Sequence, residues 1–217
     1  MGAIARSAAN LITTSGVVLK GAVNNDSFDN VTALPSSFAD GITLISSQTA
    51  SASASLSFTT GIDSTYKAYK FVFSNIHAGS NGANFNFNLS IDAGSNYNVT
   101  KTTTFVQSYH SESDGSPDVI YDTAKDLAQS TSDQIINYGL KTDNDASTSG
   151  TLTLFNPSST TYVKHFISSS KCNNASDFAI NAIVAGYGNT TSAVNAIRFQ
   201  MSSGNIDAGT IYLYGIK

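Results

Sequence analysis

Apolar and polar residues alternate along most of the chain from Gly41 onward, the pattern of strands that bury one face. The clearest case is residues 84–91, NFNFNLSI. Its apolar side chains, from Phe85 to Ile91, are expected to face a core, and its Asn and Ser side chains are expected to face water. Such strict alternation is typical of an antiparallel sheet with one solvated face.

The same period predicts further strands, and turn signals rich in Gly, Asn and Asp separate them, including Gly186-Tyr187-Gly188-Asn189. Residues 122–129, DTAKDLAQ, are the one candidate helix, of about two turns, and also fit a loop. About eight to ten strands without an internal repeat predict an all-β fold over residues 41–217, an antiparallel two-sheet sandwich of jelly-roll type. The further strands are expected at residues 42–47, 53–58, 69–76, 101–109, 151–155, 162–168, 178–187, 196–202 and 210–216.

Residues 1–40 differ from the rest because they show no sustained period of two or 3.6 residues. A disordered tail is one interpretation. We favour an extended N-terminal arm for anchoring and assembly, because the segment is too apolar for a solvated linker and would need a partner surface. The apolar residues expected to dock are Ile4, Leu11, Ile12, Val17, Val18, Leu19 and Val23.

Charged residues make up 12% of the 217 residues, about half the usual share. Ser, Thr and Asn together make up about a third of the chain, so hydroxyl and amide groups cover the surface. A flat, uncharged sheet face promotes aggregation of a free monomer, but it suits a subunit packed against copies of itself. The composition therefore favours a homo-oligomer.

The net charge is −4, and the 11 basic residues are thinly spread, with Arg6 and Arg198 as the only arginines. Nucleic-acid binding needs Lys and Arg concentrated on one face, so this class of partner is not expected. No apolar run approaches the ~20 residues that cross a bilayer, which predicts no membrane insertion. The N-terminus also lacks the apolar region of a secretion signal. The single cysteine, Cys172, cannot form an internal disulfide and indicates synthesis in a reducing cytosol.

Residues able to do chemistry are few. We expect His77 in a turn, His110 in a polar loop and His165 on a strand, and no pair of histidines has the spacing of metal ligands. Asp143 and Asp145 resemble half of a calcium loop without its Gly and closing Glu, so a turn is the first interpretation and a weak Ca²⁺ site the second. No cofactor is predicted.

The patterns of known catalytic sites are also missing from the sequence. There is no Gly-x-Ser-x-Gly elbow and no glycine-rich phosphate loop. Glu112 is the only glutamate, and the aspartates fall mostly in turns, where their hydrogen bonding to the backbone explains them. Cys172 is most simply a small buried residue. The sequence predicts that the protein is not an enzyme.

Three blocks resemble structural proteins of marine tailed bacteriophages: MGAIARSAANLITTSGVVL, SSQTASASASLSFTTGIDSTYKAYKFVFSNIHAGSN and the C-terminal GNIDAGTIYLYGIK. The resemblance covers both ends and the first third of the sandwich, whereas residues 100–200 are similar only in character. It implies a virion location with assembly in the host cytoplasm, and other virion proteins, such as major capsid or tail proteins, as partners. Two placements stay open: a capsid decoration or head-fibre subunit, favoured as a trimer, and a tail appendage.

The alternative from another class is a carbohydrate- or receptor-binding β-sandwich module that contacts a host surface glycan. Jelly rolls bind sugars through exposed aromatic side chains and Asn or Asp in loops. The absence of Trp weakens this alternative, and each tyrosine also fits a core or interface position. The tyrosines that could contact a glycan are Tyr97, Tyr109, Tyr121, Tyr138 and Tyr187.

Overall fold

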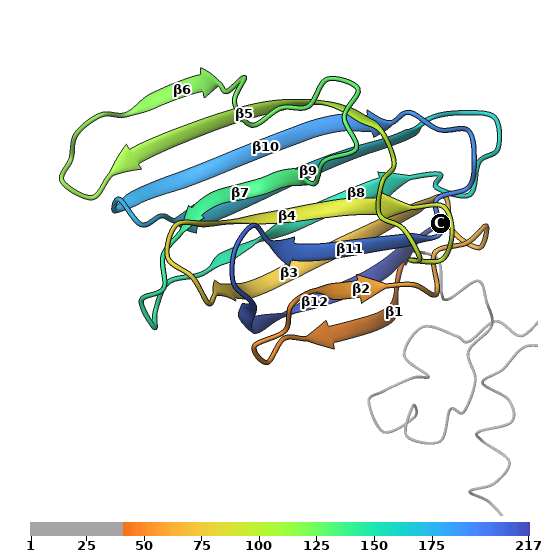
Figure 1. The fold of residues 1–217 in the computed structure, drawn as a ribbon, viewed down its shortest axis with the longest axis horizontal. Helices are drawn as coiled ribbons and strands as arrows, with labels where there is room; N and C mark the ends of the chain where they lie inside the picture. The colour runs from red at the N-terminus through yellow and green to blue at the C-terminus, as the bar shows by residue number, and fades with distance from the viewer. Residues whose placement is uncertain (1–40) are drawn as a thin grey trace, which may run out of the picture. The chain divides into compact units, whose positions relative to one another are not determined.

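The computed structural model describes residues 41–217, which form two antiparallel β-sheets packed face to face, with no helix among them. Figure 1 shows the smaller sheet in front of the larger one, whose edge strands are β1 and β6. The predicted all-β two-sheet sandwich is confirmed. The jelly-roll type stays a prediction, and the expected N-terminal arm lies outside the described residues.

All neighbouring strands in both sheets are antiparallel. Within the described chain only the β5–β6, β8–β9 and β9–β10 connections join strands of one sheet, and the others cross between sheets. The larger sheet has the order β1 (Ile42–Thr49), β12 (Ile206–Ile216), β3 (Ala68–Ala78), β8 (Thr148–Phe155), β9 (Lys164–Asn173), β10 (Phe178–Gly188), β5 (Lys101–Ser111) and β6 (Asp118–Tyr121). The smaller sheet has the order β2 (Leu56–Phe58), β11 (Ala196–Met201), β4 (Ala83–Ser90) and β7 (Gln134–Leu140).

Aromatic rings from both sheets form the centre of the core. The ring of Phe199 on β11 stacks on Phe85 of β4 at 5.8 Å between centroids and meets Phe71 of β3 at 5.4 Å. Phe73 of β3 packs edge-on against Phe85 at 5.4 Å. All four side chains are buried, and offset or edge-to-face pairs of this kind add to the free energy gained by burying the rings.

The two sheets differ in width, and this difference shapes one end of the sandwich. β7, an edge strand of the smaller sheet, lies against β9 and β10. β5 and β6 continue the larger sheet past that edge (Figure 1). Part of the inward face of β5 and β6 is therefore covered by side chains and loops instead of by a facing strand.

The candidate helix at residues 122–129 is instead an irregular segment. It comes after β6 in the chain and lies alongside β5. The backbone N–H of Ser130 donates to the carbonyl of Lys101, and the N–H of Leu127 donates to the hydroxyl of Thr103. The N–H of Thr103 in turn donates to the carbonyl of Leu127. Because these groups bond sideways to a strand, they cannot form the i to i−4 ladder of a helix.

Several predictions about strands were wrong in detail. The strand expected at residues 53–58 is only β2, and the patterns of β6 and β7 were missed. His77 lies inside β3 and His110 inside β5, so neither is in the expected turn or loop. Residues 186–188, expected as a turn, end β10; a Cβ on Gly186 would lie 2.5 Å from the carbonyl oxygen of Thr102, so glycine permits close strand packing there.

The solvated face expected for residues 84–91 is also wrong. Asn86, Asn88 and Ser90 are buried, although they point away from the core phenylalanines. Ile91, expected inward, follows the end of β4 and is exposed. Tertiary contacts on the outer side of β4 explain the burial of these polar residues.

Candidate functional site

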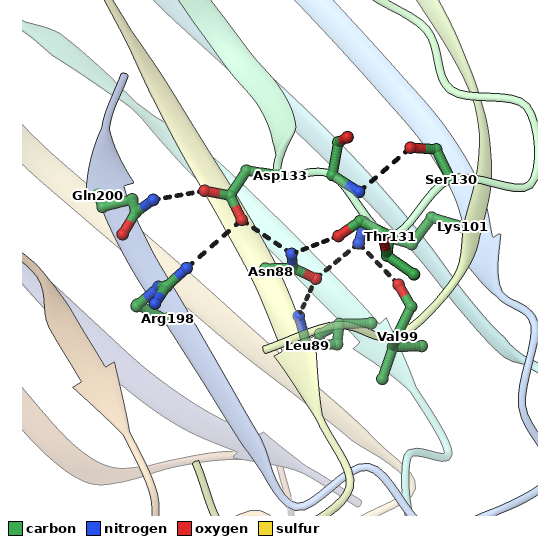
Figure 2. A network of polar contacts seen from close by, with 10 residues as sticks. Asn88, Leu89, Val99, Lys101, Ser130, Thr131, Asp133, Arg198 and Gln200 are labelled. Atoms are coloured by element: carbon green, nitrogen blue, oxygen red, sulfur yellow. Dashed lines mark hydrogen bonds and ion pairs between the residues drawn. The ribbon is translucent and has the colours of Figure 1, made fainter. Parts of the chain in front are cut away.

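A network of polar side chains crosses the outer side of the smaller sheet (Figure 2). Asn88 of β4 is its centre: its Nδ2 donates to the carbonyl of Thr131 at 3.0 Å and to Oδ1 of Asp133 at 2.8 Å. Asp133 also accepts a hydrogen bond from Gln200 and lies 3.5 Å from the guanidinium of Arg198, both on β11. Residues 131–133, just before β7, thus cover the end of β4.

Lys101, at the start of β5, brings a buried ammonium group into this network. Its Nζ donates to Oδ1 of Asn88 at 2.6 Å and to the carbonyl of Val99 at 2.8 Å. Burial lowers the pKa of Lys101 to about 8, although the negative charge of Asp133 opposes that shift. Since Lys101 has no exposed surface, we interpret it as a structural group.

A second buried lysine lies two strands away. Gly188 of β10 pairs with Lys101 on one side and with Lys164 of β9 on the other, so both lysines point to the same inner face. Nζ of Lys164 donates to the carbonyls of Tyr162 at 2.6 Å and Thr190 at 3.2 Å, and burial lowers its pKa. Carbonyl and amide oxygens therefore solvate both ammonium groups in place of water.

The outward side of the larger sheet, here called the outer face, is the surface with the most unusual composition. Paired residues in an antiparallel ladder point to the same side, so the registers identify the side chains on this face. Between the apolar residues lie mainly Ser and Thr, and the charged residues on this face are Lys70, Lys171 and Asp207, which lies at the start of β12 beside His77. The exposed large apolar residues on it are Ile42, Leu44, Val119, Tyr121, Phe155, Ile167 and Ile183.

The five candidate tyrosines do not form one platform. Tyr97 lies in the β4–β5 loop, with the Arg198 guanidinium 4.6 Å from its ring centroid. Tyr121 and Tyr187 lie on the outer face, on β6 and β10. Tyr109 and Tyr138 are packed partly against the core and line a common cavity. A glycan could therefore meet two of them together, but not all five.

The histidines lie apart from one another. Nδ1 of His77 is 3.3 Å from Asp207, and Nε2 of His110 is 3.5 Å from Asp114. His165 is on the outer face, where its ring packs edge-on against Tyr187 at 6.1 Å. In residues 41–217 no three His, Cys, Asp or Glu side chains are placed to hold a metal ion together.

Asp143 and Cys172 have clear structural contacts. The carboxylate of Asp143 pairs with Nζ of Lys141 at 2.9 Å, and a weak Ca²⁺ site with Asp145 stays a prediction. Sγ of Cys172 donates to Oδ1 of Asn137 at 3.1 Å, and burial raises the pKa of its thiol to about 12. The thiol is thus protonated and unreactive at neutral pH.

Comparison with protein families, with curated proteins and with solved structures found no match to this chain. Residues 41–217 contain no helix suited to spanning a membrane.

Proposed function

We propose that the protein is a non-enzymatic structural subunit of a bacteriophage virion that associates with copies of itself through the outer face. The exposed apolar side chains of that face are the observation that carries the proposal. They lie on β1, β6, β8, β9 and β10, and exposed apolar residues gathered on one side of a protein mark sites of association. The resemblance of three sequence blocks to phage structural proteins supports the virion class.

The composition of the outer face favours another copy of this chain as the partner. Ser and Thr hydroxyls can be covered at low cost, because they find partners among the hydroxyls of a facing sheet. Asp207, at the start of β12 and 3.3 Å from His77, is the one acidic residue at an outward position on the strands of the face, so few charges lose their water on association. Residues 1–40 would then anchor the oligomer, a trimer in the favoured arrangement, to a capsid or tail protein.

The mass of the full chain in solution tests this proposal. We expect light scattering to give a multiple of the 22.7 kDa chain mass. The double variant Ile167→Glu, Ile183→Glu puts carboxylates on β9 and β10 in the middle of the outer face, and it should be a monomer. Ile91→Glu is the matched control because Ile91, at 43% exposed, resembles Ile167 at 44% but lies outside the face.

A monomeric wild type would contradict the association, and so would a double variant that keeps the mass of the wild type. The anchoring role has a separate test. Removing residues 1–40 should leave the oligomer intact and abolish its attachment to virus particles. Attachment at full occupancy without these residues would refute the anchor.

A further inference from the structure

A cavity of about 280 Å³ opens where β5 and β6 pass the edge of β7. Its walls come from four strands, β5, β6, β7 and the start of β10, and from the turn between β9 and β10. The side chains that line the cavity include Gln107, Tyr109, Ile120, Tyr138, Asn174 and Phe178. The volume is near the lower end for small-molecule sites, which suits a ligand of one ring.

Gln107 on β5 provides a polar group without a partner. Its side chain is 2% exposed, and its Nε2 donates to Asp122 at 3.0 Å. Its Oε1 is buried and accepts no hydrogen bond in the part of the chain that the structure describes. A buried acceptor without a partner is costly, so a ligand hydroxyl that reached Oε1 would recover that free energy.

Asn174 adds a donor from the turn between β9 and β10. Its Oδ1 already accepts the backbone N–H groups of Ser176 and Phe178, both at 3.0 Å. The amide NH₂ is therefore the group that Asn174 can offer to a ligand. An acceptor on β5 and a donor in the turn after β9 match a molecule that carries several hydroxyl groups.

Aromatic rings form the remaining walls. Tyr109 and Phe178 meet edge-on at 5.6 Å, and Tyr138 adds a third ring from β7. No lining residue carries a formal charge. The nearby ammonium group of Lys125, 4.0 Å from the Tyr138 ring centroid, is already paired with the carboxylate of Asp122. The site therefore suits a neutral ligand with apolar patches.

We infer that this cavity binds one pyranose ring of a neutral sugar. One face of a pyranose presents C–H groups, which pack on aromatic rings, and its edge presents hydroxyls. Oε1 of Gln107 accepts one hydroxyl hydrogen, the amide of Asn174 donates to a second hydroxyl, and the Tyr138 ring contacts the sugar face. The inference stands apart from the proposed self-association, since the cavity is formed by inward-facing residues and the outer face by outward-facing ones.

Binding of neutral sugars to the full-length protein tests the inference. The probes are the methyl glycosides of glucose, galactose, mannose and N-acetylglucosamine, followed by saturation-transfer NMR and by titration. We expect saturable binding of at least one probe in the millimolar range. N-acetylneuraminic acid, which carries a carboxylate, should bind more weakly because nothing in the lining neutralises it.

A variant that fills the cavity from an exposed position tests the site without unfolding the protein. Ser176 is an exposed lining residue, so Ser176→Trp should block the cavity without disturbing the core, and it should weaken binding at least about tenfold. Ser64→Trp, on the exposed loop between β2 and β3, is the control and should bind as the wild type does.

Absence of saturable binding for every neutral probe would overturn the inference. Equal affinity of Ser176→Trp and the wild type would overturn it as well, since the sugar would then sit elsewhere. Light scattering on the same samples reports self-association separately. A failure of the sugar site is thus distinguishable from a failure of the proposed function.

Discussion

On the two outer sides of the sandwich, the polarity of the outward residues and their exposure to water are related in opposite ways. On the smaller sheet, outward Asn and Ser residues of β4 are buried, and residues 131–133 and the Lys101 ammonium group cover Asn88 among them. On the larger sheet, outward isoleucines of β9 and β10 are exposed. The polarity of an outward residue therefore does not decide whether water reaches it. The segments packed over the strand decide it.

The largest effect on the free energy of unfolding is expected at Asn88. Asn88→Ala removes one acceptor of the Lys101 ammonium group, which stays buried, and the donor to the partly buried Asp133. We expect the free energy of unfolding to fall by about 3 kcal/mol, because a buried charged group loses a partner. Urea unfolding at one fixed protein concentration measures it.

Asn144→Ala is the control for this prediction, since Asn144 lies in an exposed turn. It should change the free energy of unfolding by no more than about 0.5 kcal/mol. Equal effects of the two substitutions would mean that the covered network contributes no more than an ordinary surface residue.

The pH dependence of stability tests the burial of Lys101 in this network. The folded pKa of Lys101 is about 8, below the usual 10.5, so between these values the unfolded chain binds more protons than the folded one. Stability from this group therefore rises with pH in that window. From pH 8 to about pH 10, the wild type should gain about 2 kcal/mol relative to Lys101→Met.

Both proteins share the other groups that titrate in this range, including Cys172, so the difference between their urea unfolding curves isolates Lys101. Ser169→Ala, which lies on the outer face and changes no titratable group, should follow the wild-type profile across the same pH range. A Lys101→Met profile parallel to that of the wild type would show that the Lys101 ammonium group is not desolvated as its burial implies.

The smallest expected effect separates two neighbouring serines of β9. Ser170 points inward, where its hydroxyl donates to the carbonyl of Ile136 and accepts from Asn137, whereas Ser169 is exposed on the outer face. Ser170→Ala should lower the free energy of unfolding by about 1 kcal/mol, and Ser169→Ala by no more than about 0.5 kcal/mol. Thermal unfolding of both variants measures the difference, and the reverse order would contradict the assigned facing of β9.

Strand β9 shows which features the alternation of the sequence predicts and which it does not. The alternation correctly predicted a strand and placed His165 on the same side as Ile167. That side proved to be the outer face, and the inward side carries Phe166 together with Lys164 and two serines. Period-two alternation defines two faces of a strand. When both faces carry apolar as well as polar residues, it does not say which face the other sheet covers.

The candidate sites depended even more on contacts distant in sequence. Tyr109 and Tyr138 were named as possible glycan contacts, but their shared cavity also needs Gln107 and Asn174, which gave no signal of their own. Those four residues meet only because β5, β7 and the turn after β9 converge at one end of the sandwich. A sequence signal could have been the polar Gln107 at an inward strand position.

By itself, the sequence determined that residues 41–217 form an antiparallel two-sheet sandwich, because local alternation and turn residues act over a few positions of the chain. Only the tertiary structure decided that the sheets are unequal, that Lys101 and Asn88 are buried together, and that a cavity opens beyond β7. Each of these features arises where segments far apart in the chain cover, or leave open, the same patch of sheet. Burial is a property of that packing, and no single strand carries it.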